Sequence, residues 1–159
     1  MKTIALAVLM GTSGWAGAAS AQVVVAAPGP TSLEGAGAAA RAALDSSREE
    51  RTKKALGELR AALSIYYGDH EGVYPASPAE LVPRHIRAIP TAVLPGTGHA
   101  PSARVAVSKE DIQDQAAFER AVGDTGGWIY IGNPRSPLYG TIHVDSHRKD
   151  SRGVEWWMY

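Results

Sequence analysis

Two histidines and one aspartate near the end of the chain are spaced so that they could hold a metal ion. His143, Asp145 and His147 stand at positions i, i+2 and i+4, and alternate residues of a β-strand point to the same face. Imidazole nitrogens and a carboxylate oxygen are ligands that zinc accepts in proteins. The spacing therefore favours a small secreted metal-dependent enzyme as one hypothesis. The same spacing is more typical of a polar outer strand face that runs into a loop.

Other signatures of catalysis are missing from the sequence. The chain has no G-x-S-x-G stretch around a serine, no H-E-x-x-H pair and no glycine-rich phosphate loop. It has no cysteine, which excludes a thiol nucleophile, a disulfide framework and a thiolate metal site. We therefore expect a non-catalytic protein without a cofactor, and the metal-dependent enzyme is the alternative.

Aromatic side chains at the end of the chain could form a contact surface. We expect residues 155–159 to form a strand, in which Trp156 and Met158 share one face and Trp157 and Tyr159 share the other. One pair should pack on a helix. The other pair is either exposed, which would mark a contact surface, or covered by loops.

Charged residues offer a second possible contact surface. Arg51 and Lys54 belong to a run of mixed charge over residues 48–54. Such a run is usually a solvated helix face, and it can also bind a partner. The possible interaction residues are therefore Trp156, Trp157, Tyr159, Arg51 and Lys54.

A long helix should support these residues. Residues 33–67 are rich in alanine, the best helix former, and apolar residues recur at steps of three and four from Ala55 to Tyr67. This pattern predicts an amphipathic helix whose apolar stripe needs a sheet or another helix to cover it. We expect the helix to end at Gly68 and to have a weak point at residues 45–47.

The rest of the chain is predicted to contain short helices and several strands. Ser77 begins a capping box that favours a short helix, and a longer one is expected over residues 108–122. Alternation and turn residues predict strands over residues 103–107, 128–131, 138–144 and 155–159. The order of elements predicts an α+β fold, in which the long N-terminal helix packs on a small antiparallel β-sheet.

Residues 1–21 have the layout of a secretory signal peptide. A weakly basic start precedes an apolar run over residues 4–10, and the segment ends in a cleavage site of the A-x-A type. An uncleaved anchor is the alternative. We expect residues 22–32 to form a flexible leader and residues 33–159 to form one domain, located in the periplasm or outside the cell.

The charge of the chain is balanced. It carries 16 basic and 16 acidic residues, and loss of Lys2 with the signal peptide would leave one net negative charge. Such a balance provides no field that would attract nucleic acid or an anionic membrane surface. The expected partners are therefore proteins.

Several separated motifs resemble those of type IV pilins and of the pseudopilins of type II secretion systems. In chain order they are the helix exit LSIYYGDHEGVYP, the capped turn SPAELVP, the strand TGGWIYIG, the strand GTIHV and the segment KDSRG. The resemblance covers residues 55–159. It implies a pilin-like fold and a role in protein–protein contact, with other pilin-like subunits or components of the secretion machinery as partners.

The sequence departs from these families at its N-terminal end. Family members that polymerise have a basic leader and a long apolar helix that sits in the membrane. Residues 33–67 are instead rich in alanine and polar from Arg41 onward. The resemblance therefore implies an exported soluble head domain that has no membrane span once the signal peptide is removed.

The resemblance also raises a calcium site, because the major pseudopilin holds calcium in a loop of its sheet region. Calcium needs six or more oxygen ligands, and Asp124, Asp145 and Asp150 could supply some of them. Three basic residues in the same segment oppose a cation: Arg148, Lys149 and Arg152. We expect a solvated loop here rather than calcium.

Overall fold

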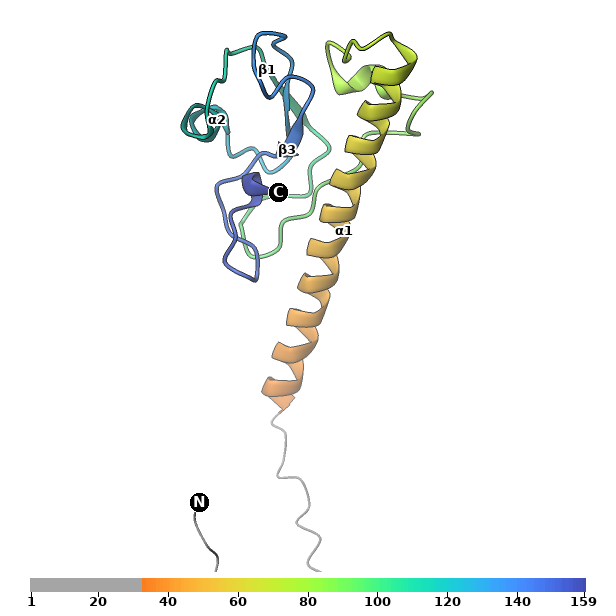
Figure 1. Cartoon of the computed structure of the whole chain (residues 1–159). Helices are drawn as coiled ribbons and strands as arrows, with labels where there is room; N and C mark the ends of the chain where they lie inside the picture. The colour runs from red at the N-terminus through yellow and green to blue at the C-terminus, as the bar shows by residue number, and fades with distance from the viewer. Residues whose placement is uncertain (1–32) are drawn as a thin grey trace, which may run out of the picture. The chain divides into compact units, whose positions relative to one another are not determined.

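The computed structural model describes residues 33–159 of the chain (Figure 1). The predicted signal peptide and leader lie outside these residues. The described elements follow one another in the order α1 (Leu33–Asp69), η1 (Pro78–Leu81), β1 (Val105–Ser108), α2 (Gln115–Ala121), β2 (Trp128–Ile131), β3 (Ile142–Val144) and η2 (Trp156–Met158).

The long helix α1 is confirmed, and it runs unbroken through the expected weak point at residues 45–47. The sequence predicted an end at Gly68, whereas the helix ends one residue later, at Asp69. In the turn that follows, Glu71 and Gly72 take left-handed conformations with φ of 54° and 89°. The Gly72 N–H then donates to the Tyr67 carbonyl at 3.0 Å, and this bond closes the last turn. No helix within residues 33–159 combines the length and the apolar character that crossing a membrane requires.

The apolar stripe of α1 packs on one face of the sheet, as predicted. Five of its side chains are buried: Ala55, Leu56, Leu59, Ala62 and Leu63. They share a core with Trp128 and Tyr130 of β2, Ile142 and Val144 of β3, and Trp156 of η2. This core fixes the helix on the sheet.

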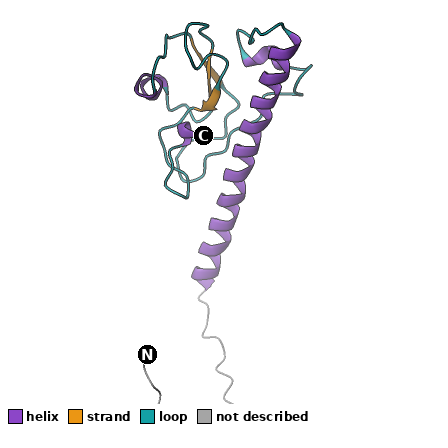
Figure 2. Ribbon diagram, in the orientation of Figure 1, coloured by secondary structure: helices purple, strands orange, loops and turns teal. Residues whose placement is uncertain are grey.

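The sheet is small and mixed, with the strand order β1-β2-β3. β2 pairs with β3 in antiparallel fashion, and Trp128 lies opposite Val144. The expectation of a wholly antiparallel sheet is wrong, because β1 pairs with β2 in parallel, with Val105 opposite Trp128. The connection between these two strands carries α2, which returns the chain so that β2 runs in the direction of β1 (Figure 2).

A second core lies on the other face of β2. Ile129 and Ile131 pack there against Phe118 of α2 and Trp157 of η2. All four residues of β2 are buried, since α1 covers one face and α2 the other. The sheet is therefore the middle layer between a long helix and a short one.

Three predicted elements differ in the structure. Of the strand expected over residues 138–144, only Ile142–Val144 forms β3, because residues 138–140 form a turn. The helix expected over residues 108–122 begins only at Gln115, after Asp114, whose carboxylate accepts a hydrogen bond from the Ala117 N–H at 2.7 Å. Ser108 is instead the last residue of β1, and its carbonyl accepts from the Gly132 N–H at 2.9 Å.

The strand expected over residues 155–159 is also wrong, because residues 156–158 form the short 3₁₀ helix η2. The Trp157 N–H donates to the Ser146 carbonyl at 3.1 Å, which holds η2 near the end of β3. A 3₁₀ helix has three residues per turn, so Trp156 and Trp157 enter different cores.

Candidate functional site

The residues of the predicted zinc site do not share a strand face. β3 ends at Val144, so only His143 belongs to the strand. The His143 ring packs against Phe118 of α2, with ring centroids 4.7 Å apart, and its Nδ1 lies 2.7 Å from the main-chain oxygen of Tyr159. Burial, with a smaller effect of Arg60, lowers the pKa of His143 and favours the neutral ring.

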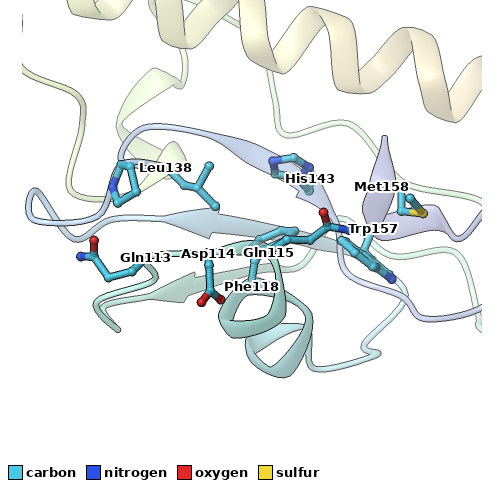
Figure 3. A pocket seen from close by; sticks show the side chains of 9 residues that line it. Gln113, Asp114, Gln115, Phe118, Leu138, His143, Trp157 and Met158 are labelled. Atoms are coloured by element: carbon cyan, nitrogen blue, oxygen red, sulfur yellow. The ribbon is translucent and has the colours of Figure 1, made fainter.

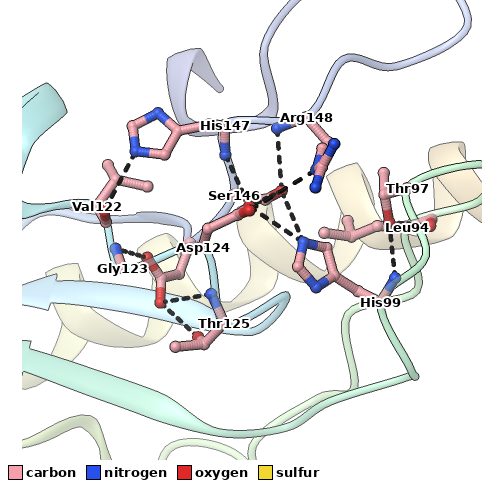
Figure 4. A network of polar contacts seen from close by, with 11 residues as sticks. Leu94, Thr97, His99, Val122, Gly123, Asp124, Thr125, Ser146, His147 and Arg148 are labelled. Atoms are coloured by element: carbon pink, nitrogen blue, oxygen red, sulfur yellow. Dashed lines mark hydrogen bonds and ion pairs between the residues drawn. The ribbon is translucent and has the colours of Figure 1, made fainter.

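Asp145 is fully buried and holds the turn before β2. Its carboxylate accepts hydrogen bonds from the Gly123 N–H at 2.6 Å, the Thr125 N–H at 3.3 Å and the Thr125 hydroxyl (Figure 4). These donors compensate for the loss of water around the carboxylate. Asp145 therefore shapes the turn.

Asp124 is the centre of a second polar network. It accepts hydrogen bonds from the Ser146 hydroxyl at 2.8 Å and the His147 N–H at 3.1 Å, and its Oδ1 lies 3.1 Å from His99 Nε2 (Figure 4). Partial burial alone would raise the pKa of Asp124, but these bonds outweigh it and lower the pKa. The network ties the loop after β3 to the turn before β2.

Asp150 joins the chain near its C-terminus to α1. Its buried carboxylate accepts from Lys53 Nζ at 2.8 Å and from the Tyr159 hydroxyl at 2.6 Å. On the same helix, the buried Glu49 accepts from the Ser151 N–H at 2.9 Å and from its hydroxyl at 2.6 Å. Each of the three aspartates considered for calcium thus accepts hydrogen bonds from donors of the protein.

The five predicted interaction residues have different environments. Trp156 and Trp157 are buried, with 0% and 5% of their surface exposed, so neither ring forms an exposed patch. Tyr159 is half-buried, and the Lys53 ammonium lies 4.3 Å from its ring centroid. These aromatic residues extend the two cores rather than alternating along a strand edge.

Arg51 and Lys54 lie on the exposed side of α1. The Arg51 guanidinium donates to the Ser47 carbonyl at 3.3 Å, and Lys54 Nζ lies 4.0 Å from a Glu58 oxygen. The Lys54 side chain is 80% exposed, so its ion pair is screened by water. Both side chains remain accessible from solvent.

An apolar groove lies between α2 and the chain that leads into β3 and η2 (Figure 3). It encloses about 330 Å³, and its walls include Phe118, Leu138, Trp157 and Met158. His143 lies at the back, and Met158 at the rim is 56% exposed. The groove is large enough to take an apolar side chain.

The first part of α1 is a feature that the sequence did not single out as a contact surface. All residues from 36 to 44 are exposed, whereas Glu49 is the first side chain of the described helix that is buried. This part of α1 extends beyond the other described elements (Figure 1). Its alanine-rich composition indicated a helix, but only the missing cover over Leu44, which is 57% exposed, identifies it as a candidate contact surface.

Comparison of the chain with models of protein families, with curated proteins and with solved structures finds no match.

Proposed function

We propose that this protein is an exported, non-catalytic, pilin-like subunit, which binds other pilin-like subunits through the projecting part of α1, residues 36–44. The observation that carries the proposal is the exposure of this entire segment, next to a helix half that is fixed in the core. The motifs that resemble pilins and pseudopilins add independent support.

The physical argument starts from the stability of isolated helices. A short stretch of helix without tertiary contacts is marginal in water, even when it is rich in alanine. Six of the nine residues from 36 to 44 are alanine, and only Arg41 carries a charge. A second helix packed along the segment would cover the apolar Leu44 side chain and stabilise this marginal part of the helix.

The composition also favours a helix as the occupant. Gly37 and the alanines project little beyond the helix backbone, so another helix can approach closely. We take a second copy of this chain as the probe, because it carries the same segment. Two copies would then associate through their N-terminal helix halves, with the sheet domains outside the contact.

Site-specific cross-linking tests this proposal, because the natural chain has no cysteine. A single Leu44→Cys substitution should give disulfide-linked dimers under mild oxidation. Val73→Cys is the matched control, since Leu44 and Val73 are each 57% exposed but Val73 lies in the chain that follows the other end of α1. Sedimentation of the cysteine-free protein should show reversible dimers, and Leu44→Arg should weaken them because it places a charge in the contact.

A protein that stays monomeric at all concentrations would refute this function. Equal cross-linking of the two cysteine variants would refute the assigned surface. The metal-dependent enzyme based on His143, Asp145 and His147 is not proposed, since these three side chains make separate contacts within the described chain.

A further inference from the structure

Three side chains that are distant in the sequence meet beside η2. Glu119 comes from α2, His147 from the loop after β3 and Glu155 from the residue before η2. One carboxylate oxygen of each glutamate and one ring nitrogen of His147 all lie within 4.8 Å of one another. We propose that they form a binding site for a divalent transition-metal ion of the zinc class. The proposal is independent of the function proposed for α1.

Two of the three ligands are already oriented by neighbouring groups. His147 Nε2 lies 3.2 Å from the Val122 carbonyl, which can only accept, so the neutral ring carries its hydrogen on Nε2 and has the Nδ1 lone pair for a metal. The Trp157 indole N–H donates to Glu155 Oε2 at 2.5 Å, which leaves the other oxygen for a cation. Hydrogen bonds of this kind from surrounding groups orient the ligands in known metal sites.

The spacing fits a metal after a small movement. Tetrahedral zinc with bonds of about 2.0–2.1 Å holds its ligand atoms about 3.3 Å apart. The three ligand atoms therefore have to move closer to one another by about 1–2 Å. Glu119 is exposed on α2, so its side chain can make most of that movement by changing rotamer.

The ligand chemistry selects among cations. Two carboxylates and a neutral imidazole balance the charge of one divalent ion, and the ion removes the repulsion between the two carboxylates. Imidazole suits zinc and its neighbours, whereas calcium and magnesium prefer oxygen ligands alone. Three protein ligands leave a fourth position of tetrahedral zinc for water.

A metal at this position would add a further link between three segments that packing and hydrogen bonds already hold together. Glu155 is next to Trp156 and Trp157, which enter the two cores, and Glu119 is next to Phe118 of the second core. The ion would therefore link α2 to η2 and stabilise the folded chain, because only the folded chain brings the three ligands together.

The test uses the chain without a histidine tag, freed of metal by a chelator. Calorimetric titration should detect one equivalent of Zn²⁺, and thermal unfolding should shift to higher temperature with Zn²⁺ but not with Mg²⁺ or Ca²⁺. Glu119→Gln should weaken zinc binding by about tenfold or more, in line with the loss of one ligand. Glu110→Gln changes another exposed glutamate outside the group and should leave zinc binding unchanged.

A second variant separates loss of a ligand from loss of fold. His147→Gln should weaken zinc binding further, while circular dichroism without metal should match that of the original chain. Absence of zinc binding, or binding that neither Glu119→Gln nor His147→Gln alters, would overturn the proposal. The second result would locate the zinc on other histidines.

Discussion

At the scale of single residues, Gly140 explains why two distant motifs of the sequence occur together. Gly140 has a φ of 81°, and a Cβ at this position would lie 2.2 Å from Cδ2 of Tyr74. The Tyr139 hydroxyl donates to the Tyr74 carbonyl at 3.1 Å, so the chain before β3 also binds the backbone beside that ring. The tyrosine after α1 therefore needs a residue without a side chain at the approach to β3.

We predict that Gly140→Ala destabilises the protein more than Gly153→Ala does. The two glycines have nearly the same φ, 81° and 80°, but a Cβ at Gly153 would meet nothing within 4 Å. Gly153→Ala should therefore cost about 1–2 kcal/mol for the left-handed backbone alone. Gly140→Ala should cost at least about 1–3 kcal/mol more, because its Cβ overlaps the Tyr74 ring. Urea unfolding of both variants measures the difference, and equal losses would contradict the steric explanation.

At the scale of elements, two acid-centred contacts fix the segment before η2 to the middle of α1. Asp150 pairs with Lys53 and Glu49 with Ser151, and residues 49 and 53 are one helical turn apart. Burial alone would raise the pKa of Asp150. The hydrogen bonds from Lys53, Tyr159 and two main-chain N–H groups outweigh this effect and hold the pKa well below its usual range.

We predict that Asp150→Asn lowers the free energy of unfolding at pH 7 by about 3–5 kcal/mol, because Lys53 then lacks its buried partner. The folded-state pKa of Asp150 is depressed. Its contribution is therefore complete above the unfolded pKa of about 3.9 and is lost as the pH falls below that value. The difference in the free energy of unfolding between the original chain and the variant should accordingly become smaller as the pH falls from 5 to 2.

Asp45→Asn is the matched control for this prediction. Asp45 pairs with Arg48 on the same helix at 3.0 Å, but both side chains are more than 40% exposed. Loss of such an exposed pair should cost at most about 1 kcal/mol. Urea unfolding at several pH values compares the two variants. The difference in the free energy of unfolding between Asp150→Asn and the original chain could also stay constant down to pH 2. That result would exclude the ionised Asp150–Lys53 pair as the cause of the difference.

At the scale of the whole described molecule, α1 has two halves with different surroundings. The half from Glu49 onward contributes the apolar stripe of the first core, while residues 36–44 have exposed side chains. The buried strand β2 lies between the two cores and couples them through its alternating side chains. Local stability should therefore change along a single continuous helix.

We predict that hydrogen exchange divides α1 into two parts. Amides of residues 52–66 should exchange only through global unfolding, since their helix face is buried in the core. Amides of residues 38–44 should exchange much faster in the dilute protein, because only local helix bonds protect them. Exchange followed by NMR or mass spectrometry measures both sets. Equal protection of the two sets of amides in a protein shown to be monomeric would contradict the prediction that the first part of α1 is only marginally stable.

The sequence by itself determined the elements whose signals are local. The spacing of leucines and alanines predicted α1 and the side that it buries, and TGGWIYIG predicted β2 with its bounds. The capping box at Ser77 is present in η1, with Glu80 bonded back to the Ser77 N–H at 3.1 Å. Helix periodicity, caps and alternation depend on residues a few positions apart, so these signals can be read directly from the chain.

Only the tertiary structure decided how these elements pair and what the polar residues do. Strand direction depends on the path of the whole connection between β1 and β2, and residues 156–158 form η2 because its bonds to the chain after β3 replace a strand ladder. In the sequence, Asp145 and Asp150 are possible ligands of a metal ion. In the structure both carboxylates are buried and accept hydrogen bonds from residues distant in the chain. The same long-range folding brings Glu119 and Glu155 to His147, and no spacing along the chain encodes such a meeting.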